Sequence, residues 1–200
     1  LGREEEAAYY EKKRMDMAEQ INARMWCEED GCYYNLKFDG TFSKRQSPDC
    51  FMPLMTGCVP KERKERLLQL LKDENKFWGE YMIPSIAKDD PAFPQQHYWR
   101  GQIWPPQTLW TYLALKRAGE EELAWELACK AAGMLSKEWN RNGYCPENYS
   151  GITGECSGAY HYNWGMLMGL PLLEELIEFR EDKVIFGNVM APDGTELKNI

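Results

Sequence analysis

Two loops, spanning residues 96–106 and 143–155, carry the side chains that are suited to binding a ligand or to catalysis. They supply one guanidinium, two carboxylates and several aromatic rings: Trp99, Arg100, Trp104, Glu147, Tyr149 and Glu155. Such groups suit a sugar, because its C–H faces pack on aromatic rings while its hydroxyls hydrogen-bond to charged side chains. A carboxylate such as Glu147 could act as a general base, and a neighbouring arginine would keep it ionised. The residue types therefore predict a carbohydrate pocket to which both loops contribute.

The helices that must position these loops are indicated by apolar residues at helical spacing. We predict helices over residues 4–25, 61–72, 105–118, 120–139 and 163–179. The second and fourth have one apolar stripe, whereas the third and fifth are apolar nearly all round and must be buried on both sides. This alternation of outer and inner helices predicts an all-α toroid made of α-hairpins. The alternative is an ordinary helical bundle, which the long aromatic loops disfavour.

Turn residues predict shorter elements. An Asp-Gly pair at positions 39 and 40 predicts a hairpin within residues 26–47. Pro171 should kink the last helix or mark its start. Residues 184–186 and a later Pro-Asp-Gly turn suggest a second hairpin. We therefore divide the chain into a body and a tail, residues 1–180 and 181–200.

Composition and charge exclude several classes of partner. The chain of 200 residues has a net charge of −8, so the phosphates of a nucleic acid would be repelled. No apolar run reaches the length of a membrane-spanning helix, and the first residues show no signal peptide. We therefore expect a cytoplasmic protein that binds neither nucleic acid nor membranes.

The cysteines and histidines predict neither a metal site nor a cofactor. Seven cysteines occur without any C-x-x-C pair, and the two histidines, His97 and His161, do not complete a metal-ligand set. No glycine-rich phosphate loop is present. The odd number of cysteines favours free thiols, with a single disulfide such as Cys27–Cys32 left open. His161 is instead expected to hydrogen-bond in the pocket or in the core.

Four motifs, in order along the chain, resemble those of family 63 glycoside hydrolases. They are Tyr98-Trp99-Arg100-Gly101-x-Ile103-Trp104, Glu147-Asn148-Tyr149, Thr153-Gly154-Glu155 and Tyr162-x-Trp164-Gly165. Trehalases and bacterial glucosylglycerate and mannosylglycerate hydrolases have a similar layout. The similarity runs from about residue 4 to residue 179. It implies an (α/α)6 barrel and hydrolysis with inversion at the anomeric carbon, and it says little about which sugar is cleaved.

The resemblance also implies roles for individual residues. An inverting glycosidase needs a carboxylate that activates water and a more distant carboxylic acid that protonates the leaving oxygen. The family's base falls on Glu147, and its ligand-contacting carboxylate falls on Glu155. The positions expected near the bound sugar are Trp99, Arg100, Trp104, Tyr149, His161 and Trp164.

The family's general acid, an aspartate with neighbouring Ser, Gly and Trp, has no counterpart in these 200 residues. Six helical hairpins also need a longer chain. We therefore expect about half of a toroid, the C-terminal part of a catalytic domain, with the acid lying upstream. Such a half should expose a wide apolar edge and either pair with the missing half or self-associate.

Three hypotheses stay open. The first is a glycosidase with Glu147 as its base. The second is a noncatalytic carbohydrate-binding module or inactive fragment, which the missing acid favours for the isolated chain. The third is a helical structural or interaction domain, in which Glu147 and Arg100 would point to solvent with no shared pocket. Without a ligand role, Glu147 would only cap a helix or loop, and Trp99, Trp104 and Trp164 would belong to the core. Only the first two predict a groove shared by Glu147 and Arg100.

Overall fold

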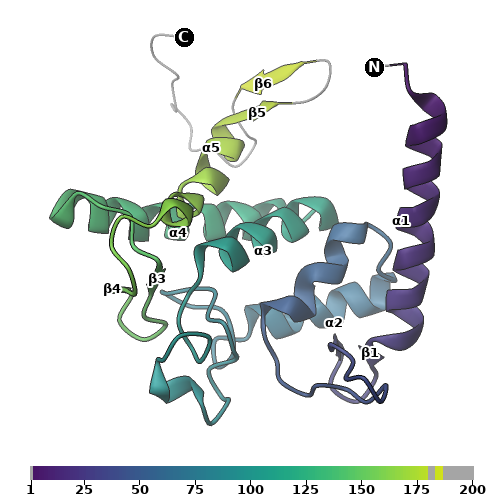
Figure 1. Ribbon diagram of the computed structural model, residues 1–200, viewed down its shortest axis with the longest axis horizontal. Coiled ribbons are helices and arrows are strands. Elements are labelled where there is room, and N and C mark those ends of the chain that lie inside the picture. Colours follow the sequence, from purple (N-terminus) through teal and green to yellow (C-terminus); the bar gives the residue numbers. More distant parts are fainter. Residues whose placement is uncertain (1, 180–182, 187–200) are drawn as a thin grey trace.

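The computed structural model describes residues 2–179 and 183–186, and this part of the chain is mostly helical (Figure 1). The α-helices are α1 (Glu4–Arg24), α2 (Lys61–Lys72), α3 (Pro105–Ala118), α4 (Glu121–Asn142) and α5 (Leu170–Leu176). The 3-10 helices are η1 (Pro48–Thr56), η2 (Phe93–Gln95) and η3 (Asn163–Met168). Antiparallel hairpins pair β1 (Trp26–Cys27) with β2 (Cys32–Tyr33), β3 (Asn148–Tyr149) with β4 (Cys156–Ser157), and β5 (Ile177–Phe179) with β6 (Val184–Phe186). The prediction of an all-α fold with short hairpins is confirmed.

Prolines and glycines set the bounds of the two central helices. α3 begins at Pro105. Proline has no N–H, and this costs nothing in the first turn of a helix, where the backbone N–H groups have no intrahelical acceptor. It ends before Gly119, whose φ of 77° is the left-handed conformation that closes a helix. Gly143, with a φ of 70°, ends α4 in the same way. The predicted bounds of α2 and α3 are therefore confirmed, and those of α1 and α4 differ by a few residues at most.

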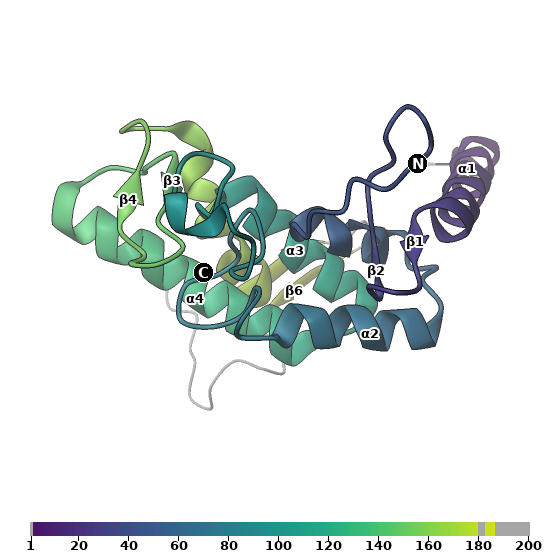
Figure 2. The same cartoon turned by 90° about the horizontal axis from the view of Figure 1, so that it is seen from below.

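α3 is the inner helix of the described body, because it packs against η1, η3 and α4. It buries polar as well as apolar side chains, including Thr108, Thr111 and Tyr112. α4 instead buries a single stripe that includes Ala124 and Leu127. Figures 1 and 2 both place the β3–β4 hairpin at the opposite end of the body from α1 and the β1–β2 hairpin.

Two groups of buried apolar side chains hold these elements together. The larger group joins the β1–β2 hairpin, η1, α2, α3 and the first half of α4. The smaller group consists of Ile103, Ala131, Met134, Tyr149 and Met168. Because Ile103 and Tyr149 belong to the two predicted site loops, the smaller group anchors those loops on α4.

α1 differs from the other helices in having little core contact. Ala18 is its buried residue, and its N-terminal end stands clear of the body in Figure 1. Among the described residues, none of the helices combines the length and the apolar character needed to cross a lipid bilayer.

The single helix predicted over residues 163–179 is wrong, because this segment forms η3, α5 and β5 in turn. Pro171 lies in the first turn of α5, where it marks the start of the helix and cannot donate a backbone hydrogen bond. Residues 177–179 leave the helix because they pair with β6, with Ile177 opposite Phe186. The division between body and tail stays a prediction, and the later Pro-Asp-Gly turn lies outside the described residues.

The region of residues 26–47 contains two tight reversals. β1 and β2 form the first, in which Cys27 faces Cys32 and both are free thiols. The second is the predicted Asp-Gly turn, where Leu36 pairs with Phe42. The Asp39 carboxylate stabilises this turn by accepting the Thr41 N–H at 2.9 Å. The hairpin predicted from the Asp-Gly pair is therefore confirmed.

Candidate functional site

Backbone hydrogen bonds hold the two predicted site loops side by side. The N–H of Ile103 donates to the carbonyl of Tyr149 at 2.8 Å, and the N–H of Tyr149 donates back to the carbonyl of Ile103 at 3.0 Å. The side-chain oxygen of Gln96 adds a second link by accepting the N–H of Gly151 at 2.7 Å. A Cβ on Gly151 would come within 2.3 Å of the Gly101 carbonyl oxygen, so this approach requires glycine. The two loops therefore form one continuous surface.

Three of the predicted tryptophans lie against one another at this surface. Trp99 stacks on Trp104 with ring centroids 4.0 Å apart and planes 12° from parallel. Trp164 meets Trp104 edge-on at 5.8 Å. Trp104 is fully buried and its Nε1 donates to the carbonyl of Tyr98 at 3.2 Å, whereas Trp99 is 41% exposed. Trp104 thus anchors the group, and Trp99 presents a ring that a ligand could cover.

Glu147 is half-buried and directly precedes β3, and the neighbouring loop fixes its carboxylate. Its backbone N–H donates to the carbonyl of Ala159 at 2.9 Å, and its Oε2 accepts the N–H of Ala159 at 3.0 Å. Gly158 makes this contact possible, because a Cβ there would lie 2.6 Å from the same Oε2. The carboxylate is therefore positioned by the backbone on its Oε2 side.

Arg100 is bonded to another partner than Glu147 in the described part of the chain. Arg100 is exposed, and its Nη1 donates to the side-chain oxygen of Gln95 at 3.0 Å. Within residues 2–179 and 183–186, no ion pair joins the Arg100 guanidinium to the Glu147 carboxylate. The backbone of Arg100 closes a tight turn, because its N–H donates to the carbonyl of His97 at 3.0 Å. A role for Arg100 in ligand binding stays a prediction.

Glu155, the other predicted carboxylate, lies on the turn between β3 and β4 and is exposed. The turn covers Tyr81, whose ring would be 2.3 Å from a Cβ placed on Gly154. The pKa of Tyr81 is raised by its hydrogen bond to Glu80, by burial and by the negative charges of Glu80 and Glu155. Glu155 is therefore near Tyr81, and its contact with a ligand stays a prediction.

A cavity of about 410 Å³ opens beside the β3–β4 hairpin. It is lined by His161, Tyr162, Asn163 and Trp164. The Nε1 of Trp164 is buried and has no hydrogen-bond partner among the described residues, which leaves a donor unsatisfied beside this cavity. The structure thus places two predicted binding residues, His161 and Trp164, in the wall of one cavity large enough for a sugar ring.

Tyr149 lies behind this surface. Its side chain is fully buried in the smaller core group, and burial raises its pKa. Its hydroxyl has no hydrogen-bond partner among the described residues. The backbone of Tyr149 links the two loops, while contact of its ring with a ligand stays a prediction.

Several side chains that shape the site were not predicted from the sequence. Gln96 and Gln102 tie the loops together, the second by donating from Nε2 to the Ser157 hydroxyl at 2.8 Å. The half-buried Tyr144 and the exposed Tyr160 form an aromatic pair next to His161 of the cavity wall. The density of aromatic residues from 160 to 164 could have indicated the second group, whereas no local pattern indicates the glutamines.

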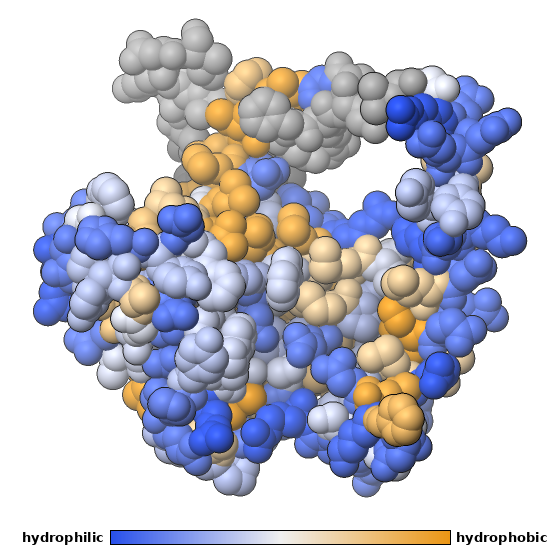
Figure 3. Space-filling view, in the orientation of Figure 1, coloured by the Kyte–Doolittle hydropathy of each residue, from blue (hydrophilic) through white to orange (hydrophobic). Residues whose placement is uncertain are grey.

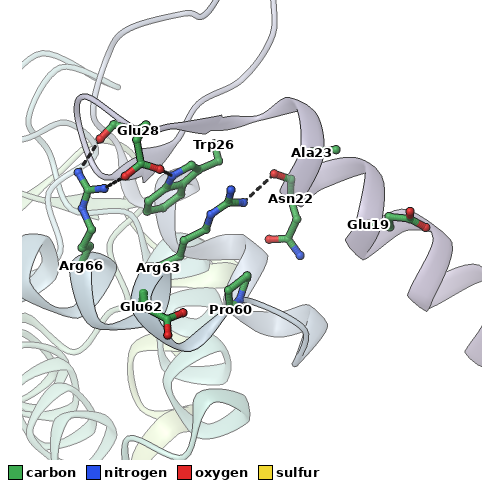
Figure 4. Close-up of a pocket in the computed structure, with 9 residues that line it drawn as sticks. All are labelled: Glu19, Asn22, Ala23, Trp26, Glu28, Pro60, Glu62, Arg63 and Arg66. Atoms are coloured by element: carbon green, nitrogen blue, oxygen red, sulfur yellow. Dashed lines mark hydrogen bonds and ion pairs between the residues drawn. The ribbon is translucent and has the colours of Figure 1, made fainter.

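A larger groove, of about 580 Å³, lies between the end of α1 and the start of α2 (Figure 4). Several of its polar groups already pair with one another. Trp26 donates to Glu28 at 2.7 Å, and the Arg63 guanidinium lies 4.9 Å from the Trp26 ring and donates to the Asn22 carbonyl at 2.7 Å. Arg66 is paired with Glu28. This groove is at the other end of the body from the tryptophan group, and its side chains brace α1 against α2.

A group of possible metal ligands lies in the β1–β2 turn, namely Cys27, Glu29 and Asp30. The Nζ of Lys44 lies 2.8 Å from Glu29 and 3.0 Å from Asp30, so one lysine already pairs with both carboxylates. This arrangement gives no reason to assign a metal site there.

Solved structures of other proteins share the fold of this chain. A family 63 mannosylglycerate hydrolase from Thermus thermophilus, solved in complex with glucose, superposes with a TM-score of 0.64 and 24% identity, over 74% of this chain and 36% of that chain. The neutral trehalase of Saccharomyces cerevisiae superposes with a TM-score of 0.62 and 19% identity, over 78% and 28%. The fold is therefore that of the helical-toroid glycosidases, and the predicted toroid is confirmed.

Sequence comparison gives the family. Residues 1–165 match the mannosylglycerate hydrolase MGH1-like glycoside hydrolase domain, and the chain belongs to that family. The mannosyl-oligosaccharide glucosidase of Saccharomyces cerevisiae is 26% identical over 80% of this chain, and the mannosylglycerate hydrolase of Thermus thermophilus is 27% identical over 73%. The chain spans 22% and 34% of the lengths of these two relatives. The resemblance to family 63 glycoside hydrolases is confirmed.

Proposed function

We propose that this chain supplies the general base and part of the sugar-binding wall of a glycoside hydrolase that acts with inversion. One observation carries the proposal: the loop that fixes Glu147 is hydrogen-bonded to the segment that lines the sugar-sized cavity. The Tyr162 N–H donates to the Cys145 carbonyl at 2.8 Å, and Glu147 exchanges backbone and side-chain bonds with Ala159. Family membership supports the same function.

In this mechanism Glu147 removes a proton from the water that attacks the anomeric carbon. Its Oε2 is held by the Ala159 N–H, which leaves Oε1 to accept that proton. The leaving oxygen is protonated by a second carboxyl group, about 6.5–9.5 Å from the base in inverting enzymes. The resemblance assigns that group to an aspartate upstream of these 200 residues. Trp99 and Trp164 would pack on the sugar and exclude bulk water from the reaction.

The test is Glu147→Gln in the complete catalytic domain that contains this chain. The substitution is nearly isosteric and removes only the base, so kcat should fall by about 10²–10⁴-fold with KM little changed. Glu122→Gln is the matched control, because Glu122 is exposed in the first turn of α4. NMR of the first-formed product should show the inverted anomer. Unchanged turnover in Glu147→Gln rules out the base assignment, and a retained anomer rules out inversion.

A noncatalytic carbohydrate-binding module is the second candidate, and the contact between Glu147 and Ala159 favours it. A hydrogen bond from a backbone N–H to a carboxylate stabilises the loop by itself, so this contact is explained without a catalytic role for Glu147. On this hypothesis the protein binds sugar without hydrolysing it, and Glu147→Gln only lowers the melting temperature, since the charge-assisted hydrogen bond is weakened. Measuring turnover and thermal unfolding on the same variant therefore separates the two functions.

A further inference from the structure

Gln102 is a buried side chain that ties strand β4 to the loop of residues 96–106. It is 7% exposed, and its Nε2 donates to the hydroxyl of Ser157 at 2.8 Å. Ser157 is the last residue of β4, the strand that pairs with β3. The bond therefore links the hairpin that follows Glu147 to the loop that carries Trp99 and Trp104.

The backbone at Gln102 is itself held from another side. The N–H of Ser85 donates to the Gln102 carbonyl at 2.9 Å, and the N–H of Gly101 donates to the Ser85 hydroxyl at 3.1 Å. Ser85 is 3% exposed, so water does not compete for these bonds. Gln102 is therefore a fixed anchor, and we expect that breaking its bond to Ser157 moves β4 rather than the loop.

Ser157 directly precedes the contact that fixes Glu147. The next residue, Gly158, lies against Glu147, since a Cβ there would be 2.6 Å from the Oε2 of this carboxylate. Ala159 follows, and its N–H donates to the same Oε2 at 3.0 Å. Because neighbouring residues of one strand move together, a displacement of Ser157 from Gln102 also displaces this N–H.

The Glu147 carboxylate depends on such a contact for its orientation. The last torsion of a glutamate side chain has a broad energy minimum, so hydrogen bonds set the plane of the carboxylate. The bond from Ala159 holds Oε2 and thereby directs Oε1. A displacement of about 1 Å can lower the rate of a catalysed step by about a hundredfold, so a small shift of β4 has a large effect on a general base.

We propose that Gln102 is a positioning residue for Glu147. Through Ser157 it holds the end of β4 where the Ala159 N–H orients the carboxylate, and it acts without contact to the sugar or to the attacking water. The proposal rests on the hydrolase function proposed above, in which Glu147 is the general base.

The test is a double-mutant cycle in the complete catalytic domain that contains this chain. Gln102→Met keeps the length of the side chain and removes the donor, and Ser157→Ala removes the acceptor. Each should lower kcat by about 10–100-fold with KM little changed, because a misaligned base impairs only the chemical step. The double variant should lose no more than either single variant, since both substitutions break the same bond. Ser157→Thr keeps the hydroxyl and should retain most of kcat.

Gln46→Met is the matched control, because Gln46 is half-buried and its side-chain oxygen accepts a hydrogen bond from the Lys76 Nζ at 2.9 Å. It should leave kcat unchanged. Thermal unfolding is measured on every variant, because a merely structural role would lower the melting temperature without a selective loss of kcat. Ser157 is half-buried, so Ser157→Ala still tests the bond if Gln102→Met does not fold.

Three outcomes overturn the positioning role while Glu147→Gln still abolishes turnover. They are a kcat in Gln102→Met equal to that of the wild type, single losses that add in the double variant, and a Ser157→Thr protein as slow as Ser157→Ala. Equal turnover in the wild type and in Glu147→Gln would instead overturn the base assignment, and the role of Gln102 with it.

Discussion

Trp99 lies flat on Trp104, with their ring centroids 4.0 Å apart. The two rings differ in their access to solvent, since Trp104 is fully buried and Trp99 is 41% exposed. A fully buried indole contributes mainly to stability, whereas an exposed indole supported from behind is a rigid surface for a ligand. The stacked pair therefore joins the core of the protein to its candidate binding surface.

Substituting each tryptophan in turn should separate these two contributions. Trp104→Ala should lower the free energy of unfolding by about 3–5 kcal/mol, because it leaves a large cavity. Trp99→Ala should lower it by only about 0.5–1.5 kcal/mol, the value of one aromatic pair, and should weaken sugar binding. Urea unfolding and sugar titration of both variants measure the difference. Equal destabilisation by the two substitutions would show that Trp99 is a core residue.

The close approach of Gly151 to Gly101 gives a second prediction. Gly151→Ala would place a methyl group 2.3 Å from the Gly101 carbonyl oxygen, so the two loops must separate. We expect a loss of about 1–3 kcal/mol in unfolding free energy and weaker sugar binding. Gly133→Ala is the control, because a Cβ on this exposed residue of α4 meets no atom within 4 Å. It should stabilise the helix by about 0.5–1 kcal/mol. A Gly151→Ala protein as stable as the wild type contradicts the loop contact.

The helix bounds could be predicted from the sequence because they depend on local residues. Pro105 begins α3 and Gly119 ends it, and each acts through its own backbone conformation. The strand at 177–179 could not be predicted in the same way. This strand forms because it pairs with β6, which lies farther along the chain. The pairing leaves no periodic pattern in the sequence of residues 177–179.

The candidate site could be predicted by residue type but not by side-chain direction. Trp99, Trp104 and Trp164 do lie together, as a shared pocket requires. Arg100 bonds to Gln95 and forms no ion pair with Glu147 among the described residues, and the turn that contains it includes Tyr98 with a φ of 52°. A positive φ at a tyrosine is rare, so the conformation of this turn could not be predicted from the sequence.

The buried tyrosines give a prediction about alkaline pH. Burial raises the pKa of Tyr149, whose hydroxyl has no hydrogen-bond partner among the described residues. The unfolded chain ionises its tyrosines above about pH 10, while the folded protein keeps Tyr149 protonated, so stability must fall as pH rises above that value. Tyr149→Phe should reduce this decline by up to about 1.4 kcal/mol per pH unit. Urea unfolding measured between neutral and alkaline pH tests it. An unchanged slope would contradict the burial of this phenol.

At neutral pH the same substitution should distinguish Tyr149 from Tyr112. Tyr149→Phe removes an unpartnered buried hydroxyl and should leave stability unchanged or increase it. Tyr112 instead donates to the buried Glu175 carboxylate at 2.7 Å. Tyr112→Phe leaves that carboxylate short of a donor and should cost about 1–3 kcal/mol. Thermal unfolding at pH 7 compares the two variants, and a larger loss in Tyr149→Phe would mean that its hydroxyl has a partner in solution.

The exposed apolar side chains of the C-terminal elements predict self-association of the isolated chain. Leu173 on α5 is 59% exposed, and Val184 and Phe186 on β6 are 45% and 53% exposed. Figure 3 shows hydrophobic colour gathered over this part of the molecule. Burying such a surface against a second copy removes apolar area from water, which stabilises the pair by about 25 cal/mol per Å².

The double variant Leu173→Gln and Phe186→Gln should therefore lower the mass measured by sedimentation velocity. Phe38→Gln, which alters an exposed ring in the Asp-Gly turn, should not. A wild-type chain that stays monomeric at high concentration would show that this surface needs no partner.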